Sequence, residues 1–167
     1  MGLNNLPKQL INRILDTNGD GTGSTNQAVD GSVTPVTFKL APAAGEVILV
    51  SRIMFYIEDT GNFDADEWGN GITLANGVQI NQKTKGTTSN FGAACKTTGD
   101  LAGMMYDINH FAFGIGNEIV CGRLTFTKFG EPMRLDGDFD DELQIVIQDD
   151  LTGLVNQRVT AQGHYSF

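Results

Sequence analysis

Much of the chain after Val36 alternates apolar and polar residues with the period of two that is typical of β-strands. Val36, Phe38 and Leu40 alternate with Thr37 and Lys39. Glu46–Ile57 is longer and apolar on both sides, which is expected of a strand buried in the middle of a domain. Further strands are predicted over Met104–Phe113, Ile119–Phe129, Leu143–Ile147 and Leu154–Tyr165, and a hairpin over Ile72–Asn81 around Asn76-Gly77.

About eight short strands with glycine-rich turns and no strand–helix–strand alternation predict an all-β fold. We expect a two-sheet antiparallel β-sandwich over residues 33–167 and favour a jelly-roll arrangement, with an immunoglobulin-like sandwich as the alternative. Thr84–Asp100 is expected to be a long loop. Alternation places six apolar residues between the sheets: Val120, Leu124, Phe126, Leu143, Ile145 and Ile147.

Residues 1–32 show a different pattern. Apolar residues recur at spacings of three and four over Leu3–Leu15, which predicts a short helix with the stripe Leu6, Leu10 and Ile14. A polar connector follows up to Ser32. We therefore expect an N-terminal helix or arm whose stripe binds a partner, the alternative being that the helix packs on its own sandwich.

The net charge of the chain and its sequence motifs argue against several classes of function. The net charge is −9 with 11 scattered Lys and Arg residues, which argues against nucleic-acid binding. The sequence predicts neither a signal peptide nor a membrane span. It has no His-Glu-x-x-His, nucleophile elbow or complete phosphate loop, so we expect neither an enzyme nor a cofactor. Cys95 and Cys121 are expected to be free thiols, with a disulfide as the alternative, and Cys121 to be a small buried residue.

Asp16, Asn18 and Asp20, followed by Gly21, match the first half of a calcium-binding loop. The expected glutamate at position twelve is Gln27, however, and no helix is predicted after the loop. A hydrophilic turn after the helix is the preferred interpretation, and calcium is the alternative.

Two further acidic clusters stand out. Glu58–Trp68 combines five carboxylates with Phe63 and Trp68, a composition that would also fit glycoside cleavage or a sugar-binding loop. We favour a solvated loop in which Phe63 and Trp68 are candidate partner-binding anchors. The second cluster, Asp136–Glu142, is interpreted as a solvated charge run, with cation binding as the alternative.

Several blocks of sequence resemble small structural proteins of tailed phages. They include Leu6–Leu10, Ala28–Val36, Phe63–Leu74, Arg134–Gly137 and Asp149–Leu154, and the resemblance extends from about Leu6 to Tyr165. It is a similarity of overall pattern, without a diagnostic motif.

The resemblance implies a virion component of the capsid cement or decoration type, made in the host cytoplasm, with a jelly-roll or related sandwich fold. Its expected partners are the major capsid protein and further copies of itself, as a dimer or trimer at capsid symmetry axes. The alternatives are a component of the neck or tail, or a carbohydrate-binding sandwich module.

Overall fold

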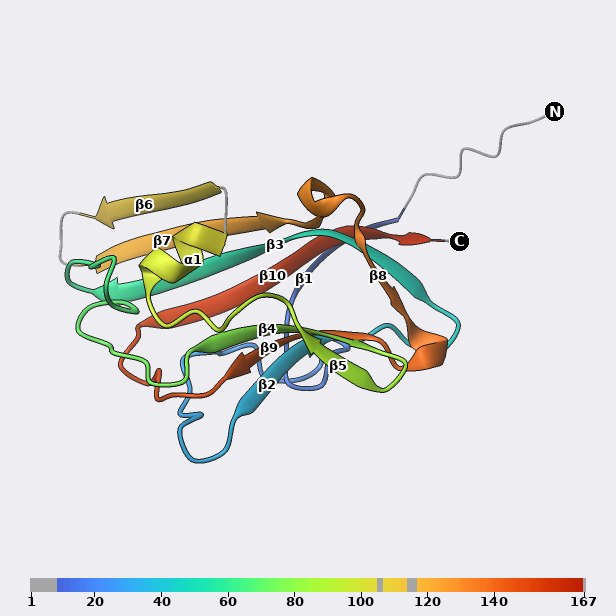
Figure 1. Ribbon diagram of the computed structural model, residues 1–167, viewed down its shortest axis with the longest axis horizontal. Coiled ribbons are helices and arrows are strands. Elements are labelled where there is room, and N and C mark those ends of the chain that lie inside the picture. Colours follow the sequence, from blue (N-terminus) through green and yellow to red (C-terminus); the bar gives the residue numbers. More distant parts are fainter. Residues whose placement is uncertain (1–8, 105–106, 114–116, 167) are drawn as a thin grey trace.

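Two antiparallel sheets pack face to face in the computed structural model, which describes residues 9–104, 107–113 and 117–166 (Figure 1). The six-stranded sheet contains, in order, β1 (Leu10–Ile14), β10 (Asn156–Ser166), β3 (Val47–Thr60), β7 (Asn117–Thr125) and β6 (Asp107–Phe113), with β8 (Met133–Asp136) beside one end of β3. The four-stranded sheet contains β2 (Val36–Leu40), β9 (Glu142–Ile147), β4 (Val78–Thr84) and β5 (Thr87–Asn90). The helical segments are α1 (Thr98–Met104), η1 (Phe126–Phe129) and η2 (Gly137–Phe139).

The expected all-β sandwich is confirmed. β1 and β3 lie in the six-stranded sheet, and β2 and β4 lie in the four-stranded sheet, so the chain alternates between them. Near its end the chain returns: β9 lies between β2 and β4, and β10 lies between β1 and β3. The resulting orders, β1-β10-β3-β7 and β2-β9-β4-β5, agree with a jelly-roll arrangement. The first and last strands therefore lie side by side, as Figure 1 shows for β1 and β10.

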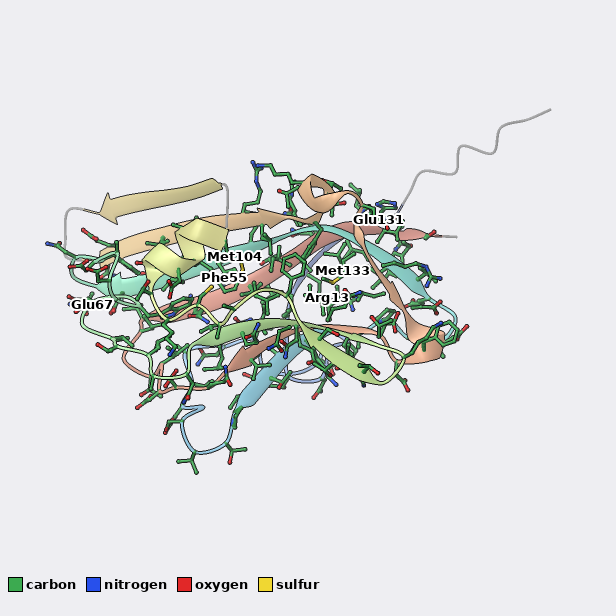
Figure 2. The ribbon with its side chains drawn as sticks, in the orientation of Figure 1. Arg13, Phe55, Glu67, Met104, Glu131 and Met133 are labelled. Carbon is green, nitrogen blue, oxygen red and sulfur yellow. The ribbon has the colours of Figure 1, made fainter. Side chains whose placement is uncertain are left out.

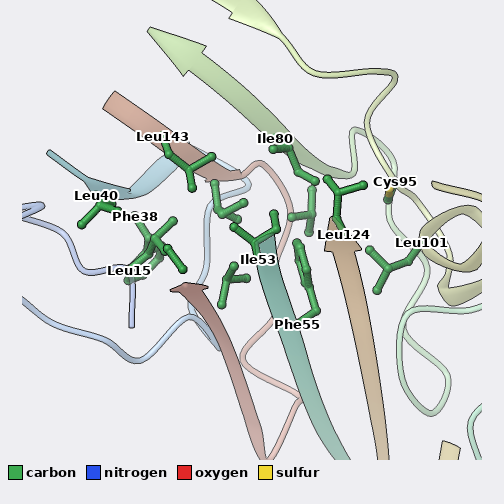
Figure 3. Packing of buried hydrophobic residues seen from close by; sticks show 14 of the residues in the cluster. Leu15, Phe38, Leu40, Ile53, Phe55, Ile80, Cys95, Leu101, Leu124 and Leu143 are labelled. Atoms are coloured by element: carbon green, nitrogen blue, oxygen red, sulfur yellow. The ribbon is translucent and has the colours of Figure 1, made fainter. Parts of the chain in front are cut away.

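The core lies between the sheets and is apolar from both sides (Figure 3). Ile53, Phe55 and Leu124 of the six-stranded sheet face Ile80 and Leu143 of the four-stranded sheet. Phe55 lies close to Met104 at the end of α1, and Met133 lies farther along the same core (Figure 2). The six residues expected in the interior are all buried: Val120, Leu124, Phe126, Leu143, Ile145 and Ile147.

The helix predicted over Leu3–Leu15 is wrong in its second half. Residues 10–14 form β1, which pairs along its whole length with β10. Ile11 and Leu15 are buried in the core, and Asp16 then bridges to Lys39 of β2, so this segment joins the edges of the two sheets. Residues 1–8 lie outside the described part of the chain. The segment 10–16 is thus built into the sandwich and does not form a separate helical arm.

Three other expectations need correction. Residues 72–75 form no strand, so the hairpin at Asn76-Gly77 is wrong: β4 pairs with β9 and β5. Residues 84–100 are not a single loop, because they contain β5 and the start of α1. The central strand β3 is buried on one side only, since its residues alternate between buried and partly exposed positions.

Carboxylates hold several loops by accepting backbone N–H groups. Asp149 accepts the N–H groups of Ala75 (3.0 Å), Asn76 (2.9 Å) and Gly77 (2.6 Å), and is itself buried. It thereby replaces the strand pairing that a hairpin would have provided for these groups.

Replacement of Asp149 tests this role. Asp149→Ala would leave three backbone donors without an acceptor, so we expect the free energy of unfolding to fall by about 2–4 kcal/mol. Urea denaturation would measure the loss. Asp150→Ala is the matched control and should cost less than about 1 kcal/mol, since the exposed Asp150 side chain bonds, among the described residues, only Thr152 in its own turn. Equal losses in the two variants would contradict the assignment.

Candidate docking face of the six-stranded sheet

The side of the six-stranded sheet that faces away from the core is here called the outer face. It consists of the outward side chains of β1, β10, β3 and β7, which the strand registers place in rows; one row contains Ile14, Thr160, Met54 and Arg123. All outward side chains of these four strands are partly or fully exposed. The face is therefore accessible across all four strands.

The middle of the outer face is apolar. Met54 is 37% exposed on the central strand, with Tyr56 next along the same face and Ile119 on the neighbouring strand. At the edge, Ile14 is half-buried and Leu10 is 82% exposed. Burial of such side chains in a complex would stabilise it, by roughly 1.5–3 kcal/mol for each one fully removed from water.

The outer face also differs from the rest of the chain in charge. Arg52, Arg123 and Arg158 project from its strands, and Glu58 is the acidic residue among the outward positions of β1, β10, β3 and β7. The whole chain, in contrast, has a net charge of −9. Acidic side chains are concentrated in loops, such as the one that carries Glu67 at one end of the molecule (Figure 2). The outer face is thus a basic region on an acidic protein.

A β-bulge interrupts the outer face between β3 and β10. Gln162 pairs with Arg52 and Gly163 pairs with Val50, so Ser51 is an extra residue in β3. Position 163 requires glycine, because a Cβ there would clash with the carbonyl oxygen of Leu49. The bulge shifts the inward side chains from Ile48 and Val50 to Ile53, and it creates a depression of about 460 Å³ beside Arg52.

Hydrogen bonds across and along the strands fix several polar side chains of the face. The Nε of Arg52 donates to Oε1 of Gln162 at 2.5 Å, and Nε2 of Gln162 donates to Oδ1 of Asn12 at 3.2 Å. The hydroxyl of Tyr56 donates to Glu58 at 2.9 Å. Burial, together with this carboxylate, raises the pKa of Tyr56 to about 12, so the phenol stays protonated at neutral pH.

The structure separates the five expected partner-binding residues. Leu10 and Ile14 do lie on the outer face, although in a strand. Leu6 lies outside the described residues. Phe63 is half-buried against the core, and Trp68 is fully buried, with its indole N–H donating to Gln157 at 2.9 Å. Trp68 is therefore a core residue and cannot be a surface anchor or a sugar-stacking platform.

The acidic turn at Asp16 is organised by hydrogen bonds. The buried carboxylate of Asp16 accepts the backbone N–H groups of Gly19 and Gly23, and Asp20 accepts both the N–H and the hydroxyl of Thr22. Asn18 donates to the same hydroxyl at 3.0 Å. These contacts are those of a turn. Within the described residues, no group of three or more His, Cys, Asp or Glu side chains is arranged to hold a metal ion.

The cluster Asp136–Glu142 is more than a solvated charge run. Asp136, Asp141 and Glu142 are buried, and Asp141 accepts the N–H groups of Lys85 and Asp136. Burial opposes ionisation of Glu142, but bonds from Gln144, Lys83 and Lys39 outweigh it and lower the pKa of the carboxyl. The interpretation of this cluster as wholly solvated is therefore wrong.

Sequence reasoning did not identify Arg52, Met54, Tyr56 or Arg158 as site residues. The apolar residues on both sides of β3 were interpreted as burial on both sides, whereas one side is the outer face. A mixture of Arg, Met and Tyr at alternate positions of one strand was the available signal, because these residue types are enriched at interfaces.

No protein-family model, curated protein or solved structure matches this chain. Among the described residues, no helix has the length and apolar character needed to cross a bilayer.

The two thiols should report on the two sides of the sheet. Cys121 is half-buried on the outer face, contrary to the expected burial, whereas Cys95 is buried in the core and its pKa is raised to about 11 by burial and by Asp100. We expect a maleimide at pH 8 to label Cys121 in the folded protein and Cys95 only after unfolding. Because burial also raises the pKa of Cys121, its labelling should accelerate as the pH rises.

Peptide mass spectrometry would identify the labelled residue, with Cys121→Ser as the control. Faster labelling of Cys95 in the folded protein would contradict the assigned orientation of β7.

Gly163→Ala tests the bulge. We expect a loss of stability of about 1–3 kcal/mol or more, because the added methyl group must displace the backbone of Leu49 and Val50. Gly103→Ala is the control: a Cβ there meets nothing within 4 Å, and alanine is the better helix former, so stability should stay equal or rise by up to about 1 kcal/mol. Unchanged thermal unfolding of Gly163→Ala would contradict the bulge geometry.

Proposed function

We propose that this protein is a non-enzymatic structural component of a tailed-phage virion, which attaches to the capsid through the outer face and stabilises contacts between major capsid subunits. The observation that carries the proposal is the outer face itself: an accessible sheet surface with an apolar middle and three arginines, on a chain of net charge −9. The resemblance in sequence pattern and the jelly-roll arrangement support the same function.

Attachment would combine two physical effects. Met54, Tyr56 and Ile119 would bury apolar surface, while Arg52 and Arg158 would attract an acidic partner and determine the orientation of docking. Each copy needs only a modest interface, because symmetry repeats it over the particle. Self-association into dimers or trimers at symmetry axes would add contacts between copies.

The alternative functions are supported less well by the described residues. A sugar-binding loop depended on Trp68 as a platform, and that side chain is buried. Glycoside cleavage depended on free carboxylates in the same loop, but Asp59 accepts the N–H groups of Thr60 and Asn70, and Glu67 accepts that of Gly71. A component of the neck or tail would dock through the same outer face, and it would differ from a capsid component in its copy number per particle.

Particle composition tests the proposal directly. Quantitative mass spectrometry of purified virions should find the protein in on the order of hundreds of copies if it covers the capsid, and roughly six or twelve if it forms a ring in the neck or tail. Its absence from particles would overturn the virion assignment.

A pair of substitutions tests the docking face. Met54→Glu places a charge in the apolar middle of the outer face, and we expect it to lower the affinity for capsids lacking the protein by at least about tenfold, with little change in melting temperature. Val146→Glu is the matched control, because Val146 is half-buried on the outward side of the other sheet. Sedimentation of particles with each variant measures binding. Equal loss in both variants would contradict docking through the outer face.

A further inference from the structure

The β-bulge forms a depression on the outer face at the edge formed by β1, β10 and β3. Five of its eight lining residues are polar, namely Asn12, Ser51, Arg52, Gln162 and His164, and the exposed Leu10 lies at its side. The volume of about 460 Å³ is enough for one side chain or a short segment of a partner.

Arg52 is pre-oriented within this depression. Its Nε is held by Gln162, which in turn is held by Asn12, so three strands fix the plane of the guanidinium. In the described part of the chain, its two terminal nitrogens have no hydrogen-bond or ion-pair partner. A guanidinium held in this way offers its remaining pair of donors to a carboxylate in the bidentate geometry that arginine favours.

The surroundings indicate which carboxylate it would bind. Leu10 and Met54 border Arg52 on the face, and such apolar neighbours are buried by a protein surface but not by a small anion. The outer face carries three arginines against one glutamate, so an acidic protein surface is its electrostatic complement and is the partner that we assign to it.

We infer that Arg52 is the recognition point of the outer face and receives an Asp or Glu carboxylate from an acidic protein partner. The inference rests on the proposed docking function and adds the chemistry of its partner. It assigns distinct roles to two arginines of the face. Arg52 binds one carboxylate with defined geometry, whereas Arg158 is exposed, has no such hydrogen bond from the described residues, and contributes charge.

NMR spectroscopy of the full-length protein tests the inference. The probes are the blocked peptide Leu-Glu-Glu-Leu and its neutral counterpart Leu-Gln-Gln-Leu. The observed signals are the Nε–Hε group of Arg52 and, for the variants that lack it, the backbone amide of the neighbouring Gln162. We expect a saturable shift with the acidic peptide and none with the neutral one. Arg52→Gln should weaken binding of the acidic peptide about tenfold. Arg52→Lys should weaken it comparably, because an ammonium group lacks the planar pair of donors of the guanidinium. Arg158→Gln should change the affinity less than twofold.

Each other outcome overturns the inference. Equal loss in Arg158→Gln would show diffuse attraction, and equal binding of the neutral peptide would show apolar contact alone. Acetate that shifts Arg52 at the same carboxylate concentration would identify a small-anion site. An Arg52-dependent dimer in sedimentation would identify a second copy as the partner. An unmoved Arg52 signal would remove the site altogether.

Particle binding separates this inference from the proposed function. If Met54→Glu abolishes attachment to capsids and Arg52→Gln does not, the docking face stands and the role of Arg52 is wrong. If neither variant affects attachment, both the proposed docking face and the inferred role of Arg52 are wrong. Backbone amide spectra of each variant would confirm that the sandwich remains folded.

Discussion

Carboxylates that accept backbone N–H groups hold the loops of this sandwich. In a jelly roll the chain repeatedly crosses from one sheet to the other, so its long connections contain N–H groups that no neighbouring strand can pair. Asp149 satisfies three of them, Asp141 fixes the turn at Lys85, and Asp59 joins the two ends of the loop that carries Trp68. Charge-assisted bonds of this kind are stronger than neutral ones.

This use of carboxylates accounts for the distribution of charge. Many of the acidic side chains lie in loops and accept backbone N–H groups there, whereas the strands of a sheet pair their own backbone groups. The outer face is consequently free to carry arginines and apolar side chains. A partner that is itself acidic would be repelled by the loops and attracted by this face, which makes charge a guide to orientation as well as affinity.

The bulge in β3 affects both the core side and the outer face of the sheet. It changes which side chains face inward, so that Val50 and Ile53 both reach the core although they are three residues apart. On the opposite side it opens the depression beside Arg52. A regular strand would have presented a flat row of side chains there, and the glycine at 163 is the backbone feature that permits the irregularity.

The sequence by itself determined the fold class and most of the core, because alternation between apolar and polar residues directly encodes which side of a strand is buried. It did not determine the state of Leu10–Ile14: Ile11 and Leu15 are four residues apart, a spacing that one face of a helix and one face of a strand share. Pairing with β10, whose residues lie about 150 positions away, decided the matter. Tertiary contacts likewise turned Trp68 inward onto Gln157 and left one side of β3 exposed. Local pattern specifies periodicity, but only the assembled sheets specify which faces are covered and which side chains meet.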